Sequence, residues 1–171
     1  MSDANIAYMP EKPGHDPIIE AINAEAFGPG RFARAAYKIR EGGLHDTALS
    51  FVAVCEDDVV GSVRQTWVAA DLSKALLLGP LAVRPAWKNR GIGRKLVAIA
   101  VEAARSAAAP MVILVGDAPY YQPLGFEPMP QGKIVMPRPV DPARLLVAEL
   151  EKGSVGPLSG ELVHADRSCV A

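Results

Sequence analysis

The chain has 171 residues, of which 50% are hydrophobic and 22% are charged, and its formal net charge is −1 at pH 7. This length and composition predict one globular domain over residues 1–171, and they exclude a wholly disordered chain. The near-neutral charge argues against a protein that coats nucleic acid or an anionic membrane, since both tasks need a basic excess.

The cysteines and the N-terminal residues give an expectation for the cellular compartment of the protein. Cys55 and Cys169 cannot form a disulfide framework, and neither belongs to a CxxC motif or a Cys/His cluster. We therefore expect free thiols, a reducing cytoplasmic location and no metal. The N-terminus lacks a basic segment followed by an apolar run, so we expect no secretory signal peptide. Residues 96–115 are the most apolar stretch, but charged residues and a proline interrupt it, so we expect no membrane span.

The first part of the chain predicts a short strand and two helical segments. Residues 6–8 predict the strand. Asp16 and Pro17 are typical of the N-cap and N1 positions of a helix, which glycines end at residues 28–30. Residues 31–40 resume a helical pattern and predict a second helix before a Gly-Gly pair.

The middle of the chain changes to strand periodicity. Residues 49–55 and 59–67 predict a β-hairpin around a Glu-Asp-Asp turn. Residues 75–83 are almost wholly apolar, as in a central strand that is buried on both faces. An amphipathic helix is expected over residues 91–107, and a second buried strand over residues 111–115. This order predicts a right-handed crossover between two parallel strands.

The last part of the chain predicts shorter elements. Residues 118–124 indicate a short helix, and residues 145–150 and 160–164 indicate two late strands. The last seven or so residues are expected to fray.

Positive charge is concentrated between residues 72 and 101. This window holds six basic residues and no acidic one, and five of the six lie in the turn between the apolar strand and the long helix. Gly91 and Gly93 in that turn allow backbone N–H groups to approach an anion closely at a helix N-terminus. A solvated basic turn fits the same residues, but the crossover favours a phosphate site. The basic residues are Lys74, Arg84, Lys88, Arg90, Arg94 and Lys95.

Two familiar phosphate-binding fingerprints do not fit this turn. The chain has no GxxxxGK[ST] string, and Leu96 stands where a GxGxxG fingerprint needs its third glycine. A nucleotide-dependent enzyme of the Rossmann type is therefore an alternative that the residues favour less.

Gly79 and Pro80 interrupt the apolar strand. Because proline cannot donate to a sheet ladder, a central strand that contains it must bulge or part from its neighbour. Parted strands leave unpaired backbone groups in the interior, and an extended ligand with its own amides could pair with them. An edge strand with a harmless proline is the alternative, but the leucines that flank Pro80 argue for burial.

Three segments within residues 75–126 match the motifs of one known family. They are Leu78-Gly79-Pro80-Leu81-Ala82-Val83-x-Pro, Lys88-Asn89-Arg90-Gly91-Ile92-Gly93-Arg94-Lys95-Leu96, and Tyr120-Tyr121-Gln122-Pro123-Leu124-Gly125-Phe126. Together they resemble the GNAT superfamily of N-acyltransferases. The phosphate loop of that family is [Gln/Arg]-x-x-Gly-x-[Gly/Ala], and this chain departs from it at Lys88. The resemblance implies an α/β (α+β) fold with a mixed, splayed central sheet flanked by helices.

The resemblance also implies an activity and a co-substrate. It implies transfer of an acetyl or other acyl group from acyl-CoA to an amine, by direct attack on the thioester and without a metal. The pyrophosphate of acetyl-CoA would lie on backbone amides of the glycine-containing loop, and the pantetheine arm would pair with the parted strand. The binding residues so implied are Leu81, Ala82, Val83, Lys88, Asn89, Arg90, Gly91, Ile92, Gly93 and Arg94.

Tyr121 matches the family position of the general acid that protonates the leaving thiolate. Tyr120 takes the aromatic packing position beside it. An ordinary packed tyrosine at a helix end is the alternative interpretation of Tyr121. A catalytically silent acyl-CoA-binding or regulatory module on the same fold is the alternative to an enzyme.

The general base is left open. Many relatives have a carboxylate on the strand before the loop, but residues 75–83 contain no acid. Asp117 is expected to cap the short helix, and His45 is expected to be an exposed loop residue. A water relay is a further option, and the other available groups are Glu56 and Glu127.

The acceptor pocket is expected from residues 27–37, the hairpin face and the late strands. The side chains there could recognise an amine that is aromatic or bears a carboxylate, but the sequence favours solvated or core roles for them. The acceptor is expected to be a small molecule or a peptide, with no nucleic-acid or membrane partner. Relatives are often dimers, so a homodimer is one option. The pocket side chains considered are Arg31, Arg34, Arg64 and Trp67.

Overall fold

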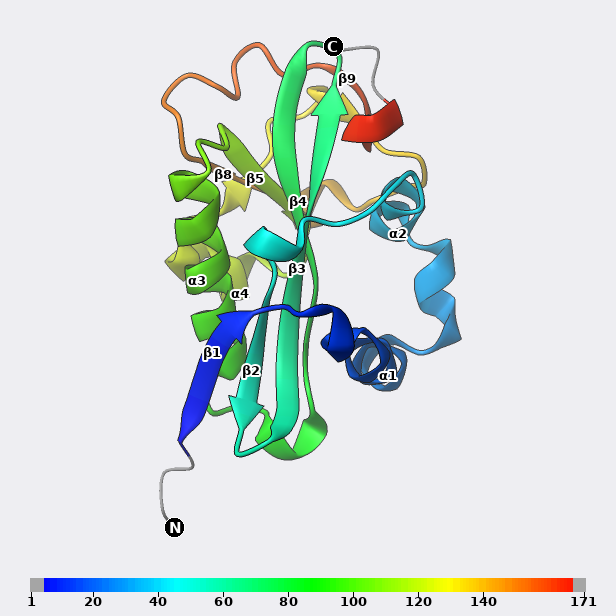
Figure 1. Ribbon diagram of the computed structural model, residues 1–171. Coiled ribbons are helices and arrows are strands. Elements are labelled where there is room, and N and C mark those ends of the chain that lie inside the picture. The colour runs from blue at the N-terminus through cyan, green and yellow to red at the C-terminus, as the bar shows by residue number, and fades with distance from the viewer. Residues whose placement is uncertain (1–4, 168–171) are drawn as a thin grey trace.

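The computed structural model describes residues 5–167, which form a nine-stranded sheet with helices on both faces (Figure 1). The strands are β1 (Ile6–Pro10), β2 (Phe51–Cys55), β3 (Asp58–Ala70), β4 (Ser73–Val83), β5 (Met111–Val115), β6 (Glu127–Pro128), β7 (Ile134–Val135), β8 (Leu145–Glu149) and β9 (Gly160–His164). The helices are α1 (Asp16–Phe27), α2 (Ala35–Arg40), α3 (Ile92–Ser106) and α4 (Ala118–Tyr121).

The sheet is mixed, as the sequence predicts. Its main order is β1-β2-β3-β4-β5-β8-β6, and β9 pairs with both β3 and β7. All pairs in the main order are antiparallel except the parallel pair β4–β5, which the α3 crossover connects. The predicted hairpin, crossover and fold class are therefore confirmed, and a doubly wound parallel sheet of the Rossmann type is excluded.

The core explains why each helix takes its side of the sheet. The apolar stripe of α3, including Leu96 and Ala100, packs with one face of the sheet in the largest hydrophobic cluster. On the opposite face, Ile19 and Ile22 of α1 form a second cluster and Ile39 of α2 joins a third. Figure 1 shows α3 on one side of the central strands, and α1 and α2 on the other.

The parallel ladder between β4 and β5 is short. It contains the pairs Leu76–Val112 and Leu77–Ile113, after which the two strands separate. On its other side β4 stays paired with β3 as far as Val83, with a register shift near the Gly79–Pro80 segment. The predicted parting of the proline-containing strand is therefore confirmed on the β5 side.

The structure corrects several predicted boundaries. Residues 31–40 are not one helix, because Arg34 is extended (φ −73°, ψ 147°) between a 3-10 turn (Pro29–Ala33) and α2. Asp16 is the first residue of α1 rather than its N-cap, because the 3-10 turn Pro13–His15 leads directly into the helix and places His15 at the N-cap. Strand β3 is longer than predicted because its end pairs with β9. Strands β6 and β7 were not predicted.

Two further findings concern the described residues. Ala165–Arg167 form a 3-10 turn, and the remainder of the segment expected to fray lies outside residues 5–167. No helix in the described part of the chain is long and apolar enough to cross a membrane.

Candidate active site

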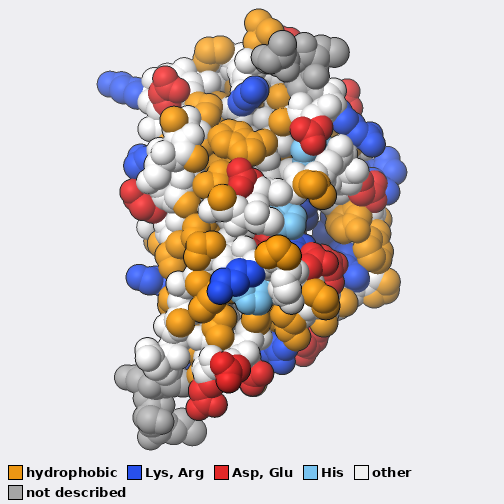
Figure 2. All heavy atoms as spheres, in the orientation of Figure 1, with side chains coloured by type: hydrophobic (Ala, Val, Ile, Leu, Met, Phe, Trp, Pro, Cys, Tyr) orange, Lys and Arg blue, Asp and Glu red, His pale blue; other side chains and the backbone are white. Residues whose placement is uncertain are grey.

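A cavity of about 930 Å³ lies where β4 and β5 separate. One wall comes from α1, α2 and the turn between them, and the other from the end of β5, α4 and residues 139–144. Residues 78–81 of β4 line it between these walls. Figure 2 shows this face hollowed, with basic side chains visible inside the hollow. The cavity therefore opens onto the strand edge that β5 leaves unpaired.

The predicted strand residues lie at this edge. Leu81 lines the cavity, and together with Val83 it packs toward the α3 cluster. The side chain of Ala82 is buried toward α1, in the cluster of Ile19 and Ile22. Only the backbone of Ala82 is therefore available to a ligand.

The predicted phosphate loop leads into α3. Asn89 (φ 62°) and Gly91 (φ 79°) both have left-handed conformations, and Gly91 is the N-cap of α3. The first N–H groups of a helix have no partner within it, and the helix dipole favours an anion there. Ile92 is only 3% exposed, so its side chain belongs to the core and only its N–H can serve an anion. Residues exposed around this turn are Lys88, Asn89, Arg90, Gly91 and Arg94.

Tyr121 lies on the cavity wall and is largely buried. Its ring passes so close to Gly116 that a Cβ there would come within 2.5 Å of Cε2. The ring also packs edge-on against Phe126, with a centroid distance of 5.8 Å. Burial raises the pKa of Tyr121 to about 12, and the neighbouring Tyr120 and Asp117 act in the same direction. The phenol is therefore protonated at neutral pH.

Tyr120 does more than pack. Its hydroxyl lies over the first turn of α3, where a Cβ on Gly93 would come within 2.6 Å of the hydroxyl oxygen. The guanidinium of Arg94 lies 5.3 Å from the centre of the Tyr120 ring. Tyr120 thus connects the cavity wall to the predicted phosphate loop.

Arg64 belongs to an interior ion-pair network. Its guanidinium donates to Glu11 (Nη2–Oε1, 2.6 Å), Asp16 (Nη2–Oδ1, 2.8 Å) and Glu20 (Nη1–Oε1, 2.9 Å). Burial opposes ionisation of Glu11, but hydrogen bonds from His45 and Arg64 outweigh it and lower the pKa of Glu11. Three satisfied carboxylates give Arg64 the core role that the sequence favours.

Of the groups considered as the general base, His45 and Asp117 line the cavity. His45 is half-buried rather than exposed, and its Nε2 lies 2.6 Å from Oε2 of Glu11. Asp117 stands at the N-cap of α4 without a capping hydrogen bond, and its carboxylate lies 3.6 Å from Nε of Arg144. The other two groups, Glu56 and Glu127, do not line the cavity.

Three arginines on the α1–α2 side also line the cavity. Arg31 donates to the carbonyl of Gly28, and the guanidinium of Arg34 lies 5.3 Å from the ring of Phe27. Arg40, which the sequence analysis missed, ends α2 and has a buried Nε. A basic residue in the last turn of a helix is common, so the sequence carries no signal for its position.

Trp67 does not reach the cavity. Its Nε1 donates to Oδ2 of Asp46 at 3.0 Å, which gives it a structural role. Within residues 5–167, no group of three or more His, Cys, Asp and Glu side chains could hold a metal ion.

Comparison with known proteins shows which domain this chain resembles. Residues 46–128 match the family model for an acetyltransferase (GNAT) domain. The chain is 31% identical over 114 residues to the uncharacterized N-acetyltransferase YjhQ of Escherichia coli (strain K12). That similarity covers 64% of this chain and 63% of the relative, so the chain matches less than two thirds of the relative's length.

Solved structures show the same fold. The GNAT family N-acetyltransferase YhbS of Escherichia coli, in complex with CoA, is 22% identical with a TM-score of 0.80, covering 97% of this chain and 93% of that one. A GNAT family acetyltransferase of Brucella melitensis, in complex with acetyl-CoA, is 22% identical with a TM-score of 0.68, covering 96% and 99%. The match over residues 46–128 thus identifies a region similar to the GNAT acetyltransferase domain, and residues 5–167 share the fold of GNAT acetyltransferases.

Proposed function

We propose that the protein is an N-acyltransferase that moves an acetyl or other acyl group from acyl-CoA to an amine. The observation that carries this proposal is the separation of β4 from β5 after Leu77, because the unpaired strand edge opens onto the cavity that Tyr121 lines. The relatives YhbS and the Brucella melitensis acetyltransferase hold CoA and acetyl-CoA, and this supports acyl-CoA as the co-substrate.

The binding proposal assigns each part of acyl-CoA to a surface with matching chemistry. The amides of the pantetheine arm pair with the free backbone groups of Leu81, Ala82 and Val83, as a surrogate for the missing strand. The pyrophosphate lies on the N–H groups at the start of α3, with Lys88, Arg90 and Arg94 adding positive charge around it. The exposed, left-handed turn at Asn89–Gly91 supports this assignment.

The chemical step follows from these positions. A backbone N–H at the edge of β4 donates to the thioester oxygen as that oxygen gains negative charge. The amine nitrogen bonds to the carbonyl carbon, the carbon–sulfur bond breaks, and the thiolate takes a proton from the hydroxyl of Tyr121. An ordinary thiol has a pKa of about 8.5, well below the value of about 12 for Tyr121, so the thiolate is the weaker base and the phenol keeps its proton until the sulfur departs. The proton transfer is therefore coupled to cleavage of the carbon–sulfur bond, and a proton from water then restores the phenol.

The amine must lose a proton before or during attack. We assign the proton acceptor to His45, directly or through a water, because it lines the cavity and Glu11 orients its ring through a contact of 2.6 Å with Nε2. Nδ1 of His45 has no hydrogen-bond partner among residues 5–167. Substitution His45→Gln should lower kcat for amine acetylation by about 10²-fold while acetyl-CoA still binds, since acid–base groups contribute 10²–10⁴-fold.

The experiment that tests the function combines binding with turnover. Calorimetry with acetyl-CoA should give saturable one-to-one binding, and release of free CoA should depend on an added amine. Binding without turnover across a broad panel of amines and peptides would favour the silent acyl-CoA-binding module. Stabilisation by NAD or ATP but not by CoA would overturn the proposal.

A further inference from the structure

The cavity wall formed by α2 holds an arginine without an ionic partner. Nε of Arg40 is buried and makes no hydrogen bond, and within residues 5–167 no carboxylate forms an ion pair with this side chain. Arg64, the other interior arginine of the cavity, has three carboxylates around it. The two arginines therefore differ, since carboxylates of the described residues neutralise Arg64 and none of them pairs with Arg40.

The isolation of Arg40 is energetically unfavourable in the free protein. Burial, and then the positive charge of Arg64, lower the pKa of Arg40 to about 10, so it still carries its charge at neutral pH. Arg40 is half-buried with its Nε fully buried, and a cation so placed without a partner costs free energy that a well-packed apolar side chain would not. An anion that enters the cavity would remove this cost.

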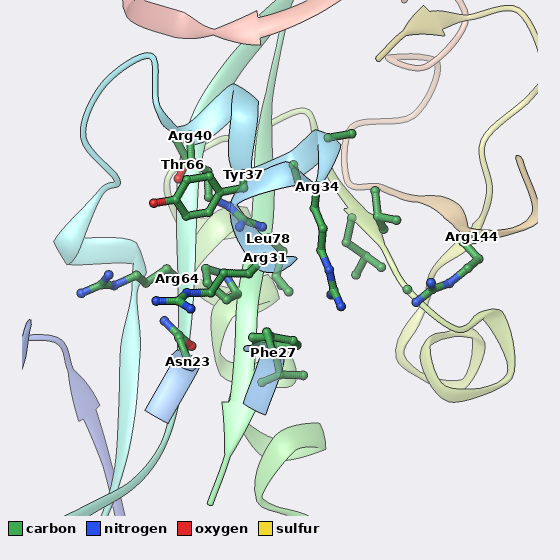
Figure 3. Close-up of a pocket in the computed structure, with 18 of the residues that line it drawn as sticks. Asn23, Phe27, Arg31, Arg34, Tyr37, Arg40, Arg64, Thr66, Leu78 and Arg144 are labelled. Carbon is green, nitrogen blue, oxygen red and sulfur yellow. The ribbon is translucent and has the colours of Figure 1, made fainter. Parts of the chain in front are cut away.

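Other polar atoms of the same wall also lack partners. Asn23 and Thr66 are 2% and 1% exposed, and Oδ1 of Asn23 and Oγ1 of Thr66 make no hydrogen bond among the described residues. Both residues line the cavity with Arg40. Figure 3 shows these side chains around one space, with Arg34 extending into it from above. The wall thus contains polar atoms from α1, α2 and β3 that have no hydrogen-bond partner among the described residues.

The position of Arg40 limits the distance between the anion and the reacting amine. A Cβ on Gly79 would come within 2.8 Å of Nη2 of Arg40. Gly79 lies where β4 has just left β5, at the strand edge to which the proposed function assigns the thioester. An anion on Arg40 is therefore only a few bonds from an amine that attacks this thioester.

We propose that the acceptor is a small amine whose amino group and oxyanion group are bonded to the same carbon, as in an α-amino acid or an α-aminophosphonate. Arg40 binds the oxyanion through paired N–H donors, and the hydroxyl of Thr66 adds a donor beside it. Oδ1 of Asn23 accepts from the polar part of the acceptor. This inference rests on the proposed function and names its substrate class.

The first test compares amines that differ only in the anion. Each of L-phenylalanine, L-leucine and L-alanine is paired with its decarboxylated amine (phenethylamine, isopentylamine and ethylamine), and L-alanine is also paired with its aminophosphonate analogue. We expect at least one member with an oxyanion to have a KM about 10- to 100-fold below that of its neutral amine, since a hydrogen bond to a charged group has that effect. Comparison of L-alanine with its aminophosphonate analogue shows whether the site prefers a carboxylate or a phosphonate. Preference for the neutral amines throughout would overturn the proposal.

The second test removes the cation. Arg40→Lys should raise KM for the preferred oxyanion substrate, but less than Arg40→Met does. Arg40→Met should raise this KM about 10- to 100-fold and change KM for the neutral amine less than threefold. Its melting temperature should equal or exceed that of the parent, because an uncompensated charge is removed. A lower melting temperature with unchanged KM would assign Arg40 a structural role. An equal loss of kcat for both substrates would assign it to the thioester oxygen, and either result overturns the proposal.

Controls separate this inference from the proposed function. Arg105→Met, on the exposed face of α3 and outside the cavity, should change neither KM nor kcat. Thermal stabilisation by the same acids and amines measures the anion site without any acyl transfer. Stabilisation by the acids that Arg40→Met abolishes, with no binding of acetyl-CoA, would retain the anion site and reject the proposed function. Acetylation of neutral amines alone would retain the proposed function and reject the anion site.

Discussion

Tyr121 and Arg64 illustrate two opposite uses of a buried polar side chain. Tyr121 is held by apolar and aromatic contacts, and its burial keeps the proton on the phenol. Arg64 is held by three carboxylates, which satisfy its donors and leave it little freedom. We therefore expect Tyr121 to matter for chemistry and Arg64 to matter for stability.

Substitution Tyr121→Phe removes the proposed acid and retains the ring. It should lower kcat about 10²-fold or more, because proton donation to a leaving group contributes 10²–10⁴-fold. The Kd for acetyl-CoA should change less than about twofold, since the hydroxyl acts only on the departing sulfur. Steady-state kinetics and calorimetry measure the two quantities, and Tyr8→Phe on β1 is the matched control. Parallel loss of binding and turnover would instead indicate a packing role for the hydroxyl.

Substitution Arg64→Met leaves the carboxylates of the network without their cation. Removing one member of a buried ion pair costs about 3–5 kcal/mol, and we expect the free energy of unfolding to fall by an amount near the lower end of this range. Lys38→Met, which breaks an exposed pair with Glu41 at 3.4 Å, should change it by less than about 1 kcal/mol. Denaturant unfolding measures both variants, and equal effects would contradict the assigned role of Arg64.

The same network predicts how stability depends on pH. Because the pKa of Glu11 is lowered in the folded state, the unfolded chain binds its proton first as the pH falls below the ordinary value of 4.5. The contribution of Glu11 to stability is thus present above that pH and lost as the pH falls through its folded pKa. Glu11→Gln should flatten the acid limb of a plot of melting temperature against pH. An unchanged acid limb would mean that Glu11 is not ionised in the network.

At the scale of elements, the first turn of α3 must accommodate both a ligand and a tyrosine. Gly93→Ala places a methyl group within 2.6 Å of the Tyr120 hydroxyl, so that the side chain or the helix must move. We expect the Kd for acetyl-CoA to rise about 10-fold, which corresponds to about 1.4 kcal/mol. Gly14→Ala is the control, since a Cβ there meets nothing within 4 Å. Calorimetry on both variants tests this, and unchanged affinity in Gly93→Ala would place the pyrophosphate elsewhere.

The elements that the sequence predicted are those with a strong local signal. The apolar run of β4 and the amphipathic pattern of α3 need no knowledge of their neighbours, and both were found within two residues of their bounds. The break at Arg34 and the two-residue strands β6 and β7 were missed because contacts with distant segments decide them. Local periodicity carries no information about such contacts.

The residues of the candidate site also differ in whether the local sequence predicts them. Gly91, Gly93 and Pro80 stand out in the sequence because their backbone chemistry is unusual. The structure brings the start of α3 beside the end of β4, where a Cβ on Gly93 would lie 3.8 Å from Val83 and 3.9 Å from Leu81. The cavity arginines and the pair of Glu11 with His45 join residues that are far apart in the chain. Only the folded chain shows that Arg64 is neutralised and that Arg40 is not.

At the scale of the whole molecule, a near-neutral chain gathers positive charge on the α1–α2 side of the cavity and in the loop before α3, whose Lys88 also lines the cavity. The loop before α3 carries the cations for which the sequence predicted a phosphate, and the α1–α2 side carries three arginines that form no ion pair within residues 5–167. Residues 78–81 of β4 and the end of β5 line the same cavity. An acyl-CoA that enters from the loop would therefore meet an acceptor that is held from the opposite side.

A crystal structure of the protein with acetyl-CoA tests this arrangement most directly. We expect main-chain hydrogen bonds between the pantetheine arm and residues 81–83, in the gap between β4 and β5. The pyrophosphate should lie over the N–H groups at the start of α3. The thioester should lie within reach of the Tyr121 hydroxyl. Acetyl-CoA bound away from the gap, or a gap that stays empty at saturating acetyl-CoA, would contradict the account.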